Sequence, residues 1–176
     1  MKTFFVTGGA GFVGSTLCEK IIAENKNNKL VILDKLTYSG NLKYLKNILH
    51  LKRVKFIKGD LLKTKSYLSF LKNADVAINV AAESHVDNSF NAPIQFTTNN
   101  TLGTHIFLEN CINSNVKKII HISSDEVYGE KLKGEYSEDS PLTPTNPYSA
   151  SKAAAELIIN SYKFSYKKKI ITLRGN

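Results

Sequence analysis

The sequence has no long apolar run and no segment that reads as a leader. None of its hydrophobic stretches approaches the roughly 20 residues that a membrane-spanning helix needs. The apolar start, residues 1–6, is short and is soon interrupted by glycines, unlike a signal peptide. We therefore expect a cytoplasmic protein that does not use a membrane. The chain of 176 residues, with 42% apolar and 22% charged residues, suits one globular domain with its own core.

Cysteine is scarce. The two cysteines, Cys18 and Cys111, both fall in helical patterns, and their spacing is not that of a metal site. We expect two small buried hydrophobic side chains, with no disulfide, no catalytic thiol and no metal.

Arginine is also scarce, although the net charge is +9. Apart from Arg53 and Arg174, the basic residues are lysines scattered along the chain, and the run at residues 167–169 falls in a predicted turn. Surfaces that recognise nucleic acids favour arginine and clustered charge. We therefore expect no nucleic-acid partner, although a basic surface attracts an anionic nucleotide.

Apolar runs alternate with helical patterns along the whole chain. The runs predict strands at residues 2–6, 30–33, 54–57, 76–80, 118–123 and 170–173. The helical patterns lie at residues 13–24, 41–49, 65–71, 96–113 and 148–166. Strands that are apolar throughout are typical of a sheet covered by helices on both faces. The fold class is therefore α/β, a doubly wound parallel Rossmann sheet in the order 3-2-1-4-5-6.

A glycine-rich loop follows the first predicted strand and opens the first helix. In this context Gly8 permits a tight turn, Gly11 lets the backbone approach a pyrophosphate, and Gly14 lets the helix pack closely on the strand. The N-terminus of the helix then offers free N–H groups and partial positive charge to phosphates. The pattern predicts a dinucleotide cofactor.

Two acidic residues at strand ends indicate which dinucleotide. Asp34 ends the second strand, 20 residues after Gly14, where a carboxylate binds the ribose 2′-hydroxyl. A 2′-phosphate would meet like charge there, which favours NAD over NADP, although the neighbouring Lys35 weakens this argument. Asp60 ends the third strand, in a position to meet the adenine edge.

Tyr148 and Lys152 form the first catalytic candidate. They lie four residues apart at the start of a helix, on one face, with Pro147 at a favourable first position. A tyrosine has a pKa of about 10, and a nearby positive charge favours its phenolate form. Ser124, at the end of the fifth strand, can bond the same substrate hydroxyl. The set predicts redox chemistry on an alcohol.

The three-glycine spacing resembles that of the extended short-chain dehydrogenase/reductase family. The resemblance implies a set of residues around the adenosine half of the cofactor, and two alanines that line the cofactor after the fourth strand. The adenosine set is Phe12, Val13, Asp34, Lys35, Leu36, Thr37, Asp60 and Leu61, and the alanines are Ala81 and Ala82.

Four segments, at residues 34–41, 81–87, 124–129 and 148–152, look like those of the dTDP-glucose 4,6-dehydratases, and the resemblance runs from Lys2 to Asn176. Related epimerases lack the adjacent acids Asp125 and Glu126, and related decarboxylases keep only the glutamate. The acid pair therefore separates the dehydratases from these relatives.

The resemblance implies a mechanism for these residues. Tyr148, with Lys152 and Ser124, takes the proton of the sugar 4-hydroxyl while hydride passes to NAD. Glu126 then removes the C5 proton and Asp125 protonates the departing 6-hydroxyl. Hydride returns to C6, so NAD is regenerated. One member of the pair must act as base and the other as acid.

The resemblance also assigns residues outside the two motifs. Ser84 touches the sugar or its phosphate, Thr98 lies near the cofactor, and Asn176 lies beside the nicotinamide. His85 is either a substrate contact or a packing residue.

Departures from the family pattern leave alternatives open. Ser124 stands where bacterial dehydratases usually carry threonine, and Asn88 replaces a common arginine. Residues 174–176 resemble the UDP-glucose enzymes of plants, so dTDP-glucose and UDP-glucose both remain candidate substrates. A nucleotide-sugar 4-epimerase is the rival enzyme.

The length of the chain is a further departure. The family has a second, smaller domain that grips the substrate nucleotide. Residues 1–176 therefore read as one truncated NAD-binding domain without the C-terminal substrate domain, either poorly active on sugar nucleotides or a non-catalytic NAD-binding fragment. In this family the two long helices form a homodimer interface, which we expect here.

Overall fold

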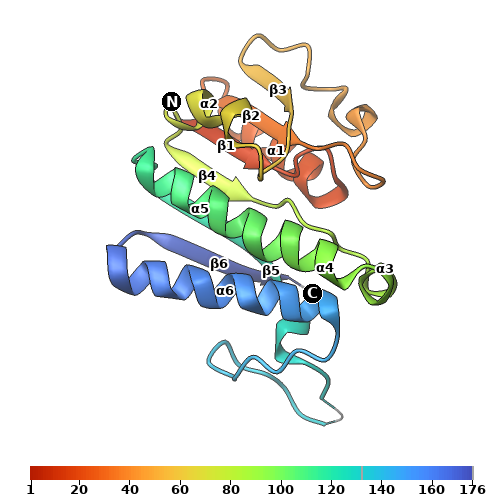
Figure 1. Cartoon of the computed structure of the whole chain (residues 1–176). Helices are drawn as coiled ribbons and strands as arrows, with labels where there is room; N and C mark the ends of the chain where they lie inside the picture. The colour runs from red at the N-terminus through yellow and green to blue at the C-terminus, as the bar shows by residue number, and fades with distance from the viewer. Residues whose placement is uncertain (132, 176) are drawn as a thin grey trace.

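The computed structural model describes residues 1–131 and 133–175 and contains one six-stranded sheet (Figure 1). All strands are parallel, in the order β3-β2-β1-β4-β5-β6. This confirms the predicted order. The strands are β1 (Thr3–Thr7), β2 (Lys29–Asp34), β3 (Val54–Lys58), β4 (Val76–Asn79), β5 (Lys118–Ser124) and β6 (Ile170–Gly175).

Helices cover both faces of the sheet. In Figure 1, α5 and α6 lie side by side across one face, and α1 lies near β1 and β2. The α-helices are α1 (Phe12–Glu24), α2 (Leu68–Leu71), α3 (Val86–Asn91), α4 (Pro93–Phe96), α5 (Gly103–Asn113) and α6 (Pro147–Tyr166). Short 3-10 turns are η1 (Leu42–Leu45), η2 (Thr64–Ser66) and η4 (Asp125–Tyr128), and η3 (Thr97–Leu102) is a π-helical segment.

Successive residues of β1 enter two different cores, as the apolar strand patterns predict. Phe5 packs with Phe107, Leu108 and Cys111 of α5, whereas Val6 packs with Cys18 and the rest of the α1 side. Phe5 and Val6 are both fully buried. Both cysteines are free and buried, which confirms their predicted role as hydrophobic side chains.

Residues 41–49 differ from expectation. The sequence predicts a helix there, but the structure has the 3-10 turn η1 followed by further turns. Leu45 and Ile48 are buried, three residues apart, while Leu42 is 39% exposed. The Asn41 side chain accepts the Lys43 N–H at 2.9 Å and starts the turn.

The helix predicted at residues 96–113 is present but starts earlier and is interrupted. It begins with α4, continues through the π-helical turn η3 and ends with α5. Two further differences are small: α6 starts at Pro147, and β5 extends to Ser124, so the acid pair begins the turn η4 directly after the strand. Among the described residues, none of the helices combines the length and apolar character needed to cross a membrane.

Candidate active site

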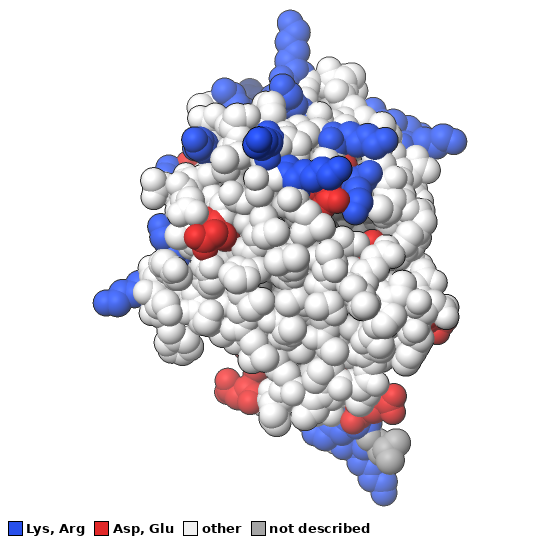
Figure 2. Space-filling model, viewed as in Figure 1, with Lys and Arg blue, Asp and Glu red and all other residues white. Residues whose placement is uncertain are grey.

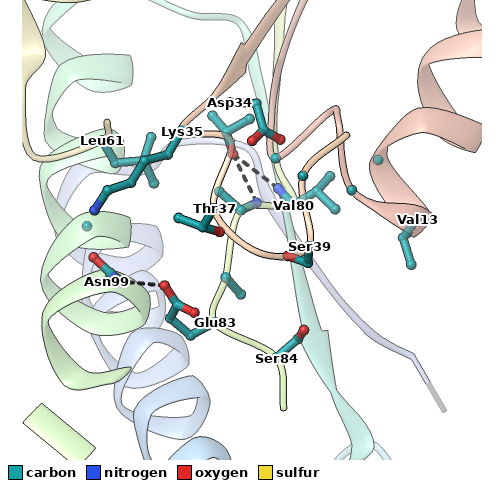
Figure 3. Close-up of a pocket in the computed structure, with 18 of the residues that line it drawn as sticks. Val13, Asp34, Lys35, Thr37, Ser39, Leu61, Val80, Glu83, Ser84 and Asn99 are labelled. Carbon is teal, nitrogen blue, oxygen red and sulfur yellow. Dashed lines mark hydrogen bonds between the residues drawn. The ribbon is translucent and has the colours of Figure 1, made fainter. Parts of the chain in front are cut away.

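The carboxyl ends of the parallel strands open into a cavity of about 670 Å³. This is where doubly wound folds bind their ligands. Figure 3 shows residues from two segments that line it, the end of β2 with the loop after it (Asp34, Lys35, Thr37, Ser39) and the segment after β4 (Val80, Glu83, Ser84).

The glycine loop fits tightly against the strands beside it. Gly8 has φ +66°, and a Cβ there would lie 2.6 Å from the Ala81 backbone. A Cβ on Gly14 would lie 2.1 Å from the Gly8 carbonyl oxygen, whereas one on Gly11 would lie 3.4 Å from it. Gly8 and Gly14 are therefore needed for close backbone packing, while Gly11 leaves the entrance to α1 clear. The first turn of α1 thus presents backbone N–H groups to a phosphate in the cavity.

Asp34 is fixed by backbone donors from both sides. One carboxylate oxygen accepts the Ala10 N–H at 2.8 Å and the other accepts the Leu36 N–H at 2.8 Å. A Cβ on Gly40 would lie 2.8 Å from this carboxylate. Asp34 is buried and lines the cavity, so its remaining lone pairs are held in a set direction toward a ligand hydroxyl.

Asp60 and Lys35 form an ion pair at the rim of the cavity. The Lys35 ammonium lies 2.8 Å from one Asp60 oxygen, and the Leu62 N–H donates to the other at 3.0 Å. Burial opposes ionisation of Asp60, but these two bonds outweigh it and hold the pKa of the carboxyl below its ordinary value. Lys35 is thus engaged by Asp60, so the charge it adds beside Asp34 is partly neutralised.

The π-helical turn η3 holds the segment after β4 through two neighbouring asparagines. The Asn99 side-chain amide donates to the Glu83 carboxylate at 2.9 Å (Figure 3). Asn100 bonds the Glu83 backbone on both sides, at 2.8 and 3.0 Å, and also donates to the Ser151 hydroxyl. π-Helical turns are frequent at functional sites. Sequence reasoning missed Glu83, Asn99 and Asn100, because an α repeat would not direct both asparagines to one segment.

Tyr38 and His85 join the two loops at the mouth of the cavity. The Tyr38 hydroxyl lies 3.2 Å from His85 Nδ1, and the two rings meet edge to face with centroids 5.2 Å apart. Ser84 lies beside them, its hydroxyl 3.5 Å from the same nitrogen. His85 is exposed, so it is not a core packing residue.

Tyr148 and Lys152 lie on the buried face of α6 and line the cavity. Burial raises the pKa of the Tyr148 hydroxyl; a hydrogen bond to Ser124 acts against this, and the charges of Glu126 and Asp125 add to it. Burial also lowers the pKa of Lys152 to about 8, opposed by the charge of Glu156. Lys152 therefore stays largely protonated at neutral pH, close to the point where it exchanges its proton.

Asp125 and Glu126 begin the turn η4, directly after β5. Ser124 caps this turn: its hydroxyl accepts the Glu126 N–H at 3.2 Å and donates to Asp125 at 3.2 Å. Val127 and Tyr128 bury the other side of the turn. Ser124 thus holds the Asp125 carboxylate and the Glu126 backbone, and the Glu126 carboxylate accepts a bond from Asn146, the residue before α6.

Arg174 links the turn η4 to α6 through several hydrogen bonds, and we call this set of contacts the Arg174 clamp. The Arg174 guanidinium donates to both Glu156 oxygens at distances from 2.7 to 3.1 Å, to the Tyr128 hydroxyl at 2.5 Å and to the Glu138 carbonyl oxygen at 2.8 Å. The acid pair lines a second hollow on this side, together with Arg174. Glu156 lies one helical turn beyond Lys152, so the clamp connects the turn η4 to the helix that carries Lys152.

Most of the residues predicted for the site line the main cavity. They are Gly8, Gly11, Phe12, Val13, Gly14, Asp34, Lys35, Thr37, Asp60, Leu61, Ala81, Ala82, Ser84, His85, Tyr148 and Lys152. Leu36, Thr98, Ser124, Asp125 and Glu126 do not line it. Asn176 lies outside the described residues. The roles assigned to all of these residues stay predictions.

The comparisons with known proteins agree with this geometry. A trifunctional protein of Arabidopsis thaliana, whose first named activity is UDP-glucose 4,6-dehydratase, is 43% identical over 99% of this chain and 27% of that protein. A dTDP-D-glucose 4,6-dehydratase of Dictyostelium discoideum is 42% identical over the whole chain and 44% of that protein.

A solved structure is similar over nearly the whole fold. The dTDP-glucose 4,6-dehydratase of Streptomyces venezuelae, determined with NAD and TYD bound, superposes with a TM-score of 0.94 at 35% identity, over 98% of this chain and 55% of the other. The chain therefore spans about half the length, or less, of the proteins it matches. The family model described as GDP-mannose 4,6 dehydratase matches residues 5–175, so the chain belongs to that family.

Proposed function

We propose that this chain is the NAD-binding and catalytic part of a nucleotide-sugar 4,6-dehydratase, which converts dTDP-glucose to its 4-keto-6-deoxy product and water. The observation that carries the proposal is the fixed acid pair Asp125–Glu126 in a turn capped by Ser124. An elimination needs a base and an acid at neighbouring carbons, and an epimerase does not.

NAD fits the residues of the main cavity. Side chains at Gly8 and Gly14 would clash with the backbone, so the glycine loop keeps the approach to the N-terminus of α1 open. The buried Asp34 carboxylate accepts a ribose hydroxyl and disfavours a 2′-phosphate. When bound, NAD supplies a reversible hydride acceptor beside the sugar.

The side chains of this chain then have distinct tasks. Tyr148 accepts the proton of the sugar 4-hydroxyl, and the positive charge of Lys152 stabilises the phenolate. The 4-ketone acidifies the C5–H bond, whose proton Glu126 accepts. Asp125 gives a proton to the 6-hydroxyl, which leaves as water. C6 would then receive the hydride that was taken from C4, and Glu126 would return its proton to C5, which gives the 4-keto-6-deoxy product. Ser124 binds the 4-oxygen.

Two nucleotides, dTDP and UDP, are candidates for the nucleotide part of the substrate. The Arabidopsis relative favours UDP-glucose as an alternative to dTDP-glucose. We further propose that the part of the enzyme that grips the nucleotide lies outside residues 1–176, so this chain retains NAD but binds sugar nucleotides weakly.

Incubation of the purified chain with NAD and either sugar nucleotide tests the proposal. A product of dTDP-glucose that is lighter by one water supports the proposal. If only UDP-glucose loses water, UDP-glucose is the substrate instead of dTDP-glucose. Asp125→Asn should stop water loss while oxidation at C4 continues. A product epimerised at C4, with no loss of water, would contradict the dehydratase proposal.

We also propose a homodimer through α5 and α6. Ala150, Leu157, Ser161 and Phe164 form an exposed stripe on α6, and Leu157 and Phe164 are 63% and 85% exposed. Figure 2, viewed as Figure 1, is largely without charged side chains over the middle of this face. Light scattering should give twice 19.6 kDa, and Leu157→Glu should give the monomer mass. A monomer mass for the unchanged chain would contradict the dimer.

A further inference from the structure

Asn146 lies at a junction between the helix that carries Tyr148 and the turn that carries the acid pair. It is the residue before α6 and caps it: its side-chain oxygen accepts the Ser149 N–H at 2.8 Å. In return, the Ser149 hydroxyl bonds the Asn146 backbone, which completes a capping box. The cap fixes which way the Asn146 amide group points.

The other end of the same amide reaches the acid pair. Asn146 Nδ2 donates a hydrogen bond to Glu126 Oε2 at 3.1 Å. Because the amide oxygen is held by the helix, its NH₂ group is directed at Glu126 with little freedom to rotate away. The Glu126 backbone N–H is separately held by the Ser124 hydroxyl, so Asn146 orients a carboxylate whose backbone is already fixed.

We propose that Asn146 is a positioning residue for Glu126, which ties the base of the elimination to the helix that carries Tyr148. This inference rests on the proposed dehydratase function. A carboxylate that accepts a directed N–H bond is oriented and stays a proton acceptor. The residue thus sets the distance between the group that acts at the sugar 4-oxygen and the group that acts at C5.

Two substitutions separate this role from that of a helix cap. Asn146→Ser keeps a good cap but is too short to reach Glu126. Asn146→Asp also keeps the cap, but it replaces the donor with a second carboxylate that repels Glu126. Both variants should therefore keep the melting temperature of the unchanged chain, which shows that the fold is intact.

The contact itself is measured without turnover. In a ¹⁵N–¹H spectrum, the Asn146 side-chain NH₂ signals are assigned by their loss in Asn146→Asp. We expect Glu126→Gln to shift these signals and Asp125→Asn to leave them in place, because Asp125 is bonded to Ser124 instead. NH₂ signals that do not respond to Glu126→Gln would overturn the inference, whether or not the chain is active.

The consequence for the reaction is measured step by step, with NAD and the sugar nucleotide that the chain converts. Uptake of deuterium from solvent at C5 should fall about ten- to hundredfold in both variants, the size expected for a lost hydrogen bond to a charged group, and more in Asn146→Asp. Oxidation at C4 should change by less than about twofold. Equal losses in the two steps would show a merely structural role. If no sugar nucleotide reacts, even at a concentration high enough to offset the weak binding, the proposed function fails, and the NH₂ signals still decide the contact.

Discussion

The ammonium group of Lys152 donates a hydrogen bond to the carbonyl oxygen of Ile122, 2.6 Å away on β5. This bond holds the lysine side chain against β5, and Lys152 is only 4% exposed. Burial lowers its pKa from 10.5 to about 8. The unfolded chain therefore binds more protons than the folded chain between pH 8 and 10.5.

We predict that Lys152→Met stabilises the fold at neutral pH while it abolishes oxidation at C4. Below pH 8 both states of the unchanged chain are protonated and the cost of the buried charge is fully present. As pH rises from 8 to 10.5 that cost, about 3 kcal/mol at most, disappears. Urea unfolding of both proteins at pH 7 and pH 10 checks this. A stability difference that does not shrink with pH would contradict it.

Two glycines of the loop should respond differently to the same substitution. Gly14→Ala should destabilise the fold by about 1–3 kcal/mol or more, since its Cβ would meet the Gly8 carbonyl oxygen at 2.1 Å. Gly11→Ala should leave the unfolding midpoint nearly unchanged but weaken the binding of NAD, because its Cβ enters the space before α1. Urea unfolding and calorimetric titration with NAD measure the two effects, and equal unfolding midpoints would contradict the difference.

Arg174 should matter mainly because Glu156 is buried. The Glu156 side chain is 2% exposed, and Arg174 is its cationic partner. Arg174→Met removes the hydrogen-bonded counter-charge of this carboxylate and should cost about 3–5 kcal/mol of stability. The double variant Arg174→Met/Glu156→Leu should recover most of the loss, as measured by urea unfolding. Losses that simply add would show that the pair is not coupled.

The bond between Tyr38 and His85 should strengthen NAD binding, because it holds the two loops together before the cofactor arrives. Tyr38→Phe should raise the dissociation constant of NAD about fivefold, the effect expected from the loss of one neutral hydrogen bond. In a His85→Phe background the same change should have no further effect. Tyr44→Phe, a change in the same cavity, is the matched control. An equal loss in the control would point to a general effect on the cavity.

The fold was predictable because its signals are local. Apolar strands, the glycine loop and Asp34 at a strand end each depend on a few neighbouring residues, and the parallel order follows from their alternation. The same holds for Tyr148 and Lys152, whose spacing on a helix brings them to one face. By contrast, sequence reasoning did not identify Asn146, whose side chain caps α6 and whose amide also reaches Glu126, 20 residues earlier.

The parts that were missed depend on geometry that spacing does not encode. The π-helical turn places Asn99 and Asn100 against one segment, which an α repeat would separate. Residues 41–49 have helical apolar spacing, yet Asn41 starts a 3-10 turn there. The acid pair lines a second hollow together with Arg174 and Tyr128, which are bonded to each other and come from distant parts of the sequence.

The sheet order also affects how the chain folds during synthesis. The central strand β1 pairs with β2 on one side and with β4 on the other, where Phe4 lies opposite Val76. From Asp34 to Asn79 the ribosome adds 45 residues, which takes about 2–9 s. During that interval β1 has an unpaired edge, the kind of edge that aggregates. The nascent chain therefore passes through a period of seconds in which a chaperone has the most to protect.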